Sequence, residues 1–279
     1  MLLETQANLG GDLRTERLAR LTNMSRSRFN SIFASTVGET VKQYTLRLRL
    51  ERAAFRLRAE TTDVTIIAFD LGFGSHEAFT RAFRSQFQTS PRAYRQLPPG
   101  GLPQSHYETP GLQESTDQLC LSGTRVVELE AMPVLFRRYV GPYEQVRPES
   151  FYELTAWTHQ MSVPVEGLIG IAHDAPGITP PERLRFDVCI RVADRVAGDA
   201  ATAYQVLPRR WASSTWYSGP SSRIGEAVAA AYRASTALAN FTVTGLPLEE
   251  HYTSSHILSG SRIEAMRIHF RLVPTGSLH

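Results

Sequence analysis

Cysteine, lysine and long apolar runs are all scarce in this chain of 279 residues. Its only cysteines, Cys120 and Cys189, are far apart and make neither a disulfide framework nor a zinc site. No apolar run approaches the ~18 residues of a membrane span. The N-terminus lacks the basic start, apolar block and cleavage site of a secretory signal. We therefore expect a cytoplasmic protein with reduced thiols and no membrane partner.

Motifs of catalysis are also missing. The sequence contains no nucleophile elbow, phosphate-binding loop or HExxH motif. His173 and Asp174 are adjacent, but no third metal ligand follows at a suitable spacing, and the stretch Asp174-Ala-Pro-Gly177 is typical of a turn. We expect no catalytic residues, no metal and no cofactor.

Positive charge is confined to one part of the chain. Residues 1–98 contain 15 Lys and Arg against 9 Asp and Glu, a net charge of +6, whereas residues 99–279 contain 15 against 18, a net charge of −3. An excess of positive charge in one half favours a polyanionic partner for that half.

The chain divides near residue 100. Apolar residues have helical spacing up to there, whereas residues 98–118 are rich in Pro, Gly, Ser and Gln and have no apolar period. Beyond Arg125, strand-like segments alternate with helical ones. We predict an all-α domain over 1–98, a linker over 99–122 and an α+β domain over 123–279.

Each half repeats itself. In the first, Phe29, Phe33, Gly38 and Tyr44 are matched 50 residues later by Phe79, Phe83, Gln88 and Tyr94. In the second, the stretch Tyr139-Val-Gly-Pro142 is echoed by Tyr217-Ser-Gly-Pro220, and helical segments follow over 150–161 and 224–239. Both halves are therefore predicted to be tandems of one unit.

Two short helices joined by a tight turn are predicted in each N-terminal unit. In the first, Asn23 tolerates the left-handed backbone of the turn and Ser25 caps a second helix, whose Ile32, Phe29 and Phe33 are expected in the core. In the second, Gly72 and Ser75 have the same roles. This pattern is that of a helix-turn-helix, whose second helix enters the major groove of double-stranded DNA.

A helical segment without a breaker, Val41–Glu60, separates the two units. At ~1.5 Å per residue it forms a rod of roughly 30 Å. Since one turn of DNA is about 34 Å, the two recognition helices could occupy successive major grooves.

The N-terminal sequence resembles the AraC/XylS-type DNA-binding domain over residues 12–96, most specifically from Ile66 to Arg95. The resemblance implies base readers on the exposed faces of both recognition helices, and it implies a promoter or operator as the target, with RNA polymerase a further candidate partner. Arg81 suits guanine, Asn30 adenine and Glu77 a cytosine amino group, whereas Arg26 and Arg84 suit phosphate. The full predicted DNA-binding set is Arg26, Ser27, Asn30, Ser31, His76, Glu77, Thr80, Arg81 and Arg84.

The C-terminal half resembles the GyrI-like effector-binding domain, and its segment with HDAP…TPPERLRFD is the most specific part. The resemblance implies a tandem of βαββ-like units with a central cleft, and it points to Glu250 as an acidic residue of that cleft. A carboxylate among aromatic rings favours a cationic aromatic effector. The full predicted ligand-binding set is Tyr143, Trp157, Phe186, Trp216, Glu250 and Tyr252.

The sequence therefore predicts a transcription regulator that senses a small aromatic molecule. Two alternatives stay open for the C-terminal half. One is a small-molecule hydrolase in which Glu250, with Tyr143 or Tyr252, activates water. The other is a module that sequesters a protein, for which a large exposed apolar patch would be the sign.

Overall fold

The computed structural model describes residues 9–11, 13–97, 120–220, 223–253 and 263–275. The chain splits into two compact units, Met1–Pro99 and Gly100–His279. Most of the predicted linker, residues 99–122, lies outside the described residues. In the part of the chain that is described, no helix combines the length and apolar character needed to cross a membrane.

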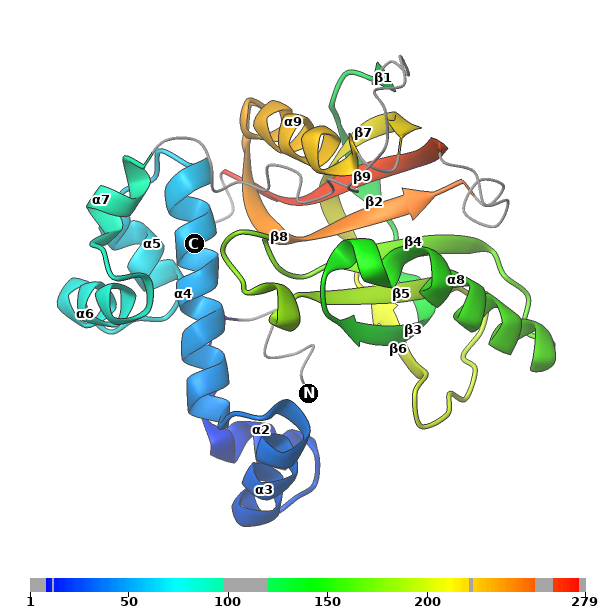
Figure 1. Ribbon diagram of the computed structural model, residues 1–279, viewed down its shortest axis with the longest axis horizontal. Coiled ribbons are helices and arrows are strands. Elements are labelled where there is room, and N and C mark those ends of the chain that lie inside the picture. Colours follow the sequence, from blue (N-terminus) through cyan, green and yellow to red (C-terminus); the bar gives the residue numbers. More distant parts are fainter. Residues whose placement is uncertain (1–8, 12, 98–119, 221–222, 254–262, 276–279) are drawn as a thin grey trace. The chain divides into compact units, whose positions relative to one another are not determined.

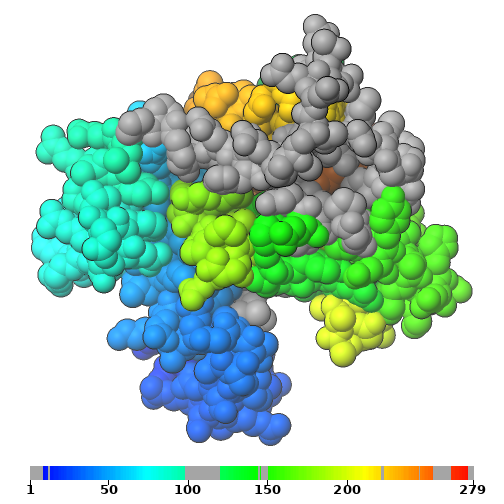
Figure 2. Space-filling model, viewed as in Figure 1, coloured from blue at the N-terminus to red at the C-terminus, as the bar shows by residue number. Residues whose placement is uncertain are grey.

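The first unit is built from helices, and α4 is its axis. In chain order the helices are α2 (Thr15–Leu21), α3 (Arg26–Val37), α4 (Val41–Ala59), α5 (Val64–Asp70), α6 (His76–Phe87) and α7 (Pro91–Arg95). Helices α2 and α3 lie at one end of α4, and α5, α6 and α7 gather toward the other (Figure 1). Figure 2 shows these ends, blue and cyan, as two separate lobes. The prediction of an all-α N-terminal domain is confirmed.

Local signals account for where these helices begin and turn. The Ser25 and Ser75 hydroxyls accept hydrogen bonds from the backbone N–H of Arg28 (3.3 Å) and Ala78 (3.1 Å), which caps α3 and α6. Asn23 and Gly72 have φ values of 53° and 77°, as the two tight turns require.

The two helical units share one core arrangement. Phe33 packs edge-on against Tyr44 with ring centroids 5.4 Å apart, and Phe83 packs against Tyr94 in the same way at 5.3 Å. The 50-residue echo is therefore a structural repeat. The expectation that Ile32 is in the core is wrong, because its side chain is 42% exposed. At about 100° per residue, Ile32 lies roughly 80° from the centre of the buried stripe that Phe29 and Phe33 define.

Over its described residues, the second unit consists of one antiparallel sheet and two helices. Its strands are β1 (Cys120–Leu121), β2 (Arg125–Leu129), β3 (Met132–Val140), β4 (Gly167–Ala172), β5 (Arg185–Arg191), β6 (Ala203–Leu207), β7 (Arg210–Pro220), β8 (Phe241–Tyr252) and β9 (Ile263–Pro274). They are ordered β1-β7-β9-β8-β4-β5-β3-β6, and β2 also pairs with β7. The helices are α8 (Tyr143–Gln160) and α9 (Ile224–Thr236), with a short 3-10 turn at Pro181–Arg183. The prediction of an α+β domain is confirmed.

Both helices cover the same face of the sheet. Phe151 of α8 packs on Phe186 of β5, and Tyr232 of α9 packs on Phe270 of β9. A continuous row of paired residues runs from Phe186 through β4 and β8 to Phe270, and paired residues point to the same side of a sheet. We call the side that carries this row the helix face and the other side the second face.

A strand-helix-strand-strand unit occurs twice, as β3-α8-β4-β5 and as β7-α9-β8-β9 (Figure 1). The two copies join where β4 pairs with β8, and the register there sets Gly170 opposite Glu250. The predicted tandem is therefore present. Helix α8 begins at Tyr143, directly after Gly141-Pro142, and not at residue 150 as expected.

Candidate functional site

The recognition face of α3 is exposed. Ser27, Asn30 and Ser31 all lie at the surface. Arg26 forms an ion pair with Glu16 of α2, with 2.9 Å between Nη1 and Oε1, and both side chains are well exposed. An exposed pair of this kind contributes little to stability, so Arg26 can exchange Glu16 for a phosphate at low cost.

On α6 the predicted residues divide into two groups. Glu77, Arg81 and Arg84 are exposed and lie along one side of the helix. His76 is half-buried, and its Nδ1 is 3.3 Å from the Thr65 hydroxyl. Thr80 was expected to be exposed, but its Oγ1 is buried and has no hydrogen-bond partner among the residues that the structure describes. Position 80 lies roughly 80° from the centre of the stripe that Phe79 and Phe83 define, on the side opposite to the one that Ile32 occupies on α3.

Glu77 is held at the beginning of α6. Hydrogen bonds from its own backbone N–H and from the Ser75 hydroxyl lower its pKa. A negative charge is favoured at a helix N-terminus, where backbone N–H groups are unpaired. The carboxylate therefore stays ionised, and reading a base would require it to leave these donors.

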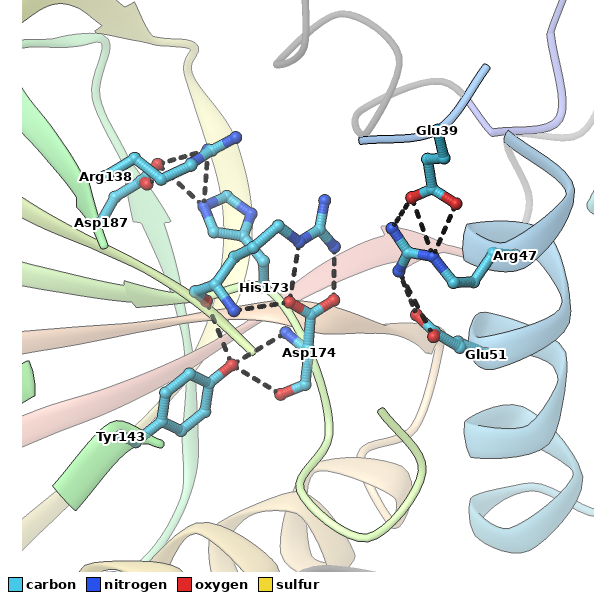
Figure 3. Close-up of polar contacts among 9 residues, drawn as sticks. Glu39, Arg47, Glu51, Arg138, Tyr143, His173, Asp174 and Asp187 are labelled. Atoms are coloured by element: carbon cyan, nitrogen blue, oxygen red, sulfur yellow. Dashed lines mark hydrogen bonds and ion pairs between the residues drawn. The ribbon is translucent and has the colours of Figure 1, made fainter. Parts of the chain in front are cut away.

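Several arginines of α4 are engaged within the protein. Arg47 Nε is 3.1 Å from Glu39 Oε1, and its Nη1 is 3.3 Å from Glu51 Oε2 (Figure 3). Arg56 pairs with Glu60 and with Asp70. The charge count over residues 1–98 includes these arginines, although their guanidinium groups are already occupied. The i,i+4 spacing of Arg47–Glu51 and Arg56–Glu60 is the sequence signal for these pairs.

In the second unit, four aromatic rings and one carboxylate gather on the helix face. Ring centroids are 5.6 Å apart for Tyr143–Phe186 and 5.3 Å apart for Phe151–Tyr252, and Phe151 also packs on Phe186 at 6.5 Å. The Tyr252 hydroxyl donates a hydrogen bond to Glu250 Oε2. Tyr143, Phe186, Glu250 and Tyr252 of the predicted ligand set are therefore brought together. Together with Phe151 they form a group of five residues, which we call the aromatic cluster.

Glu250 is fully buried and stands opposite a glycine. Its relative exposure is 0%. A Cβ atom on Gly170 would lie 3.2 Å from Glu250 Oε2 and 2.4 Å from Phe186 Cζ. Only glycine leaves room for both groups, so Gly170 is part of the site although the sequence did not indicate it.

Phe151 is the other residue that sequence reasoning missed. It follows Tyr143 by eight residues on α8, and its ring touches both Phe186 and Tyr252. The signal was the helical spacing of Phe151 with the buried Leu154.

The Tyr143 hydroxyl binds backbone. It accepts a hydrogen bond from the Asp174 N–H (3.0 Å) and lies within donating distance of the carbonyl oxygens of Asp174 (2.9 Å) and Arg185 (3.1 Å). The Asp174 carboxylate accepts from Arg185 N and Nε, both at 2.8 Å. Figure 3 shows these bonds at the loop that begins at His173. Tyr143 and Asp174 thus anchor this loop.

The two tryptophans of the predicted set lie elsewhere. Trp157 stacks against Arg137, whose Cζ is 5.9 Å from the ring centroid. Arg137 is three strands from Glu250 along one row, or about 14 Å at ~4.8 Å per strand. Trp216 pairs with Arg267, which is the partner of His251, and so points to the second face.

The second face carries two compensated charge networks. In one, Arg138 binds Asp187 through Nε (2.6 Å) and Nη2 (2.7 Å), and His173 Nε2 is 2.8 Å from Asp187 Oδ2 (Figure 3). Burial lowers the pKa of His173. Burial alone would raise the pKa of Asp187, but the contacts with His173 and Arg138 outweigh burial and hold the pKa below its usual range.

The second network joins Glu249 to Arg210 and His251. Arg210 Nε is 2.7 Å from Glu249 Oε1, and His251 Nε2 is 2.8 Å from Oε2. Burial opposes ionisation of Glu249, but the contacts with His251 and Arg210 outweigh it and lower its pKa to about 2. His269 packs on the His251 ring at 4.5 Å, and burial lowers the pKa of His269 to about 3. Among the described residues, no group of three or more His, Cys, Asp or Glu side chains could hold a metal.

Comparison with known proteins matches each unit to a family. Residues 18–97 match a helix-turn-helix domain, and residues 124–257 match a GyrI-like small molecule binding domain. The chain is 41% identical over 81 residues to the HTH-type transcriptional regulator AlkR of Acinetobacter baylyi. These residues make up 29% of this chain and 26% of AlkR. It is 38% identical over 88 residues to a DNA gyrase inhibitor of Serratia proteamaculans, and the matched segment makes up 30% of this chain and 56% of the inhibitor.

A further relative is matched over most of its length. The probable transcription factor PqrA of Proteus vulgaris is 31% identical over 104 residues, which cover 37% of this chain and 84% of PqrA. The chain spans only about a quarter to a third of the first relatives it matches. With a helix-turn-helix unit and a GyrI-like unit in one polypeptide, the chain belongs to the AraC-type family of helix-turn-helix transcription regulators.

Proposed function

We propose that this chain is a ligand-responsive transcription regulator that acts in the cytoplasm and binds an operator on double-stranded DNA through α3 and α6. The observation that carries the proposal is the repeat itself. Two capped helices with exposed polar faces stand at the two ends of α4, whose 19 residues span roughly 28 Å at ~1.5 Å each. That length suits two successive major grooves. RNA polymerase stays a candidate partner that no described contact tests.

The DNA-binding proposal is tested by in vitro selection. The full chain is incubated with random double-stranded DNA, and the retained sequences are read. We expect a bipartite site whose two halves are about one helical turn apart. Enrichment of a single short half-site, or of none, would contradict simultaneous reading by α3 and α6.

We further propose that the aromatic cluster binds the effector, a small aromatic molecule with a cationic group directed at Glu250. Four rings provide flat apolar contact, and the carboxylate beside the Tyr252 hydroxyl provides a counter-charge. Trp157 and Trp216 do not share this position, so they are left out of the proposed contact set.

Sensing agrees with the geometry better than hydrolysis does. Glu250 is fully buried and its Oε2 accepts a hydrogen bond from the Tyr252 hydroxyl, whereas activation of water needs a carboxylate that reaches water. The Tyr143 hydroxyl is occupied by backbone groups. The known relatives named above are regulators or an inhibitor.

The ligand proposal is tested by titration calorimetry with the Glu250→Gln variant. Removal of the carboxylate should weaken a cationic aromatic ligand by at least ~1.5 kcal/mol, roughly tenfold, because the cation is then left unpaired in an apolar cleft. A neutral ligand of the same shape should lose much less. The matched control is Glu166→Gln, an exposed carboxylate on the same unit that should change neither affinity. Equal losses for both ligands would place the counter-charge elsewhere.

A further inference from the structure

Arg49, near the middle of α4, binds three carbonyl oxygens from two distant parts of the first unit. Its Nε is 2.7 Å from Leu9 O, its Nη2 is 3.2 Å from Gly11 O and its Nη1 is 3.1 Å from Gly72 O. The guanidinium is planar and presents its donors in a rigid fork, so three such bonds restrict the groups that accept them.

The accepting carbonyls belong to the two different helix-turn-helix units. Residues 9–11 lead into α2, and Leu9 and Leu13 are both buried, at 7% exposure. Gly72 is the left-handed residue in the turn between α5 and α6. Arg49 therefore holds a segment of the first helix-turn-helix unit against the turn of the second helix-turn-helix unit. We call residues 9–11 the strap.

The strap and the turn are in close contact. A Cβ on Gly10 would lie 2.3 Å from Asp70 O, at the end of α5. A Cβ on Gly72 would lie 2.7 Å from Arg49 Nη2 and 3.0 Å from Gly10 O. At both positions a side chain would force the strap, the guanidinium and the turn apart.

We infer that Arg49 and the strap set the separation and relative orientation of α3 and α6, and thereby the spacing between half-sites that the chain accepts on DNA. Without the strap the two helix-turn-helix units are joined through α4 alone, and each can bend or twist relative to the other at the ends of α4. The strap adds a second connection that limits this motion. The inference rests on the proposed function, because half-site spacing matters only if both helices read DNA.

The consequence on DNA is geometric. Each added base pair moves one half-site by about 3.4 Å and turns it by roughly 35° relative to the other. A rigid pair of recognition helices cannot follow that change, whereas a loosely joined pair can. Spacing discrimination, the ratio of affinities for the selected site and for a site with one base pair inserted, therefore reports on the rigidity of the pair.

Two variants and two controls separate this role from general damage. Arg49→Met removes the three bonds and keeps an unbranched side chain in place of the aliphatic part of Arg49. Gly10→Ala displaces the strap without changing any charge. The control Arg58→Met also removes a positive charge from α4. Arg58 donates to the carbonyl oxygens of Tyr94 and Leu97, which both follow the second helix-turn-helix, so its loss does not free the strap. The control Gly74→Ala adds a methyl group that meets nothing within 4 Å.

The first measurement needs no DNA. Spin labels are attached at Ser35→Cys and Ser85→Cys, exposed positions on α3 and α6, in a Cys120→Ser background, and the interspin distance distribution is recorded for the full chain. The two controls should give one narrow distribution, as the parent does. Arg49→Met and Gly10→Ala should broaden it clearly. Unchanged widths in both of these variants would overturn the inference, whatever the chain does on DNA.

The second measurement is fluorescence anisotropy on the selected site and on versions with one base pair inserted or deleted. Arg49→Met and Gly10→Ala should reduce spacing discrimination by about tenfold, equivalent to ~1.4 kcal/mol, while Arg58→Met keeps the spacing discrimination of the parent. Full discrimination in both variants overturns the inference and leaves the proposed function standing. A parent chain that selects no bipartite site overturns both.

Discussion

At the scale of single residues, the same residue type has different roles depending on what surrounds it. Arg81 is exposed on α6, whereas Arg49 and Arg58 donate to backbone carbonyls and Arg47 is enclosed by two glutamates. Guanidinium groups that are already bonded have less to offer DNA. Arg81 and Arg84 are therefore better candidates for DNA contact than the arginines of α4.

Arg81→Ala should cost about 1–3 kcal/mol on the selected site and relax specificity at one base pair, because a bidentate contact with guanine is lost. Competition binding against sites changed at each position measures this. Arg84→Ala is the comparison, and it should weaken selected and random DNA alike. An equal loss on both kinds of DNA for Arg81→Ala would assign it to phosphate.

Burial of two neutral histidines should make the fold sensitive to mild acid. The pKa of His173 is lowered by burial, and that of His269 is lowered to about 3. Below about pH 6.5 the unfolded chain takes up protons at both sites and the folded chain does not, so the free energy of unfolding falls. His269 should contribute a loss of about 1.4 kcal/mol between pH 7.5 and pH 5.5, and His173 should add a loss in the same direction. The stability that Asp187 and Glu249 contribute through their lowered pKa values is lost only below about pH 4.

Urea unfolding at pH 7.5 and pH 5.5 checks this expectation. His269→Gln should remove about 1.4 kcal/mol of the pH-dependent loss, because its proton-binding site is then absent from the unfolded chain. His159→Gln alters an exposed histidine on α8 and should leave the loss unchanged. If His269→Gln shows the parent's full pH dependence, His269 is not a source of that dependence.

At the scale of elements, the recognition helices depend on their caps. Ser75 accepts from the Ala78 N–H and also supports Glu77, so one hydroxyl holds both the beginning of α6 and an exposed carboxylate. On α3 the Ser25 hydroxyl has the same capping role. Each of the two helices that the proposed function places in a major groove therefore begins at a serine whose hydroxyl caps its first turn.

Ser75→Ala should destabilise the chain by about 1 kcal/mol, because an N–H of the first turn of α6 loses its acceptor. Thermal or urea unfolding of the full chain measures the loss. Ser85→Ala, at an exposed position of the same helix, is the matched control and should change stability by less than about 0.5 kcal/mol. Equal effects of the two substitutions would show that the cap contributes nothing.

At the scale of the whole molecule, the two units divide charge and chemistry between them. The first unit contains the basic excess and both recognition helices, and the second contains the aromatic cluster and a net negative charge. We expect residues 1–98 alone to bind DNA, and a fragment from residue 120 onward not to bind it.

Salt titration of residues 1–98 is the corresponding measurement. Each phosphate that the fragment neutralises should add about −0.9 to the slope of log K against log salt, so the slope should be clearly negative. A slope near zero would contradict a phosphate-dominated contact. Binding by the fragment from residue 120 would contradict the division between the units.

Much of the architecture could be predicted from the sequence, because its signals are local. Ser25, Asn23 and Gly72 act through hydrogen bonds and backbone angles within a few residues, so their roles can be inferred without knowing the rest of the fold. The two internal echoes likewise became structural repeats. Glu250 was chosen from a family resemblance, and Phe186 and Tyr252 were chosen as aromatic residues of the same half. The structure brings the three together.

The tertiary structure alone decided which side chains share a face. Trp216 and Glu250 both lie on strands, but the pairing of β7 with β9 and of β9 with β8 sends them to opposite sides of the sheet. Because side chains alternate along a strand, a shift of one residue in register would exchange the faces, and register depends on strands far apart in the chain. Gly170 faces Glu250 across 80 residues of sequence, and Arg49 reaches Leu9 across 40, for the same reason. Contacts within one turn of helix follow from the order of residues, whereas contacts between strands and units follow only from packing.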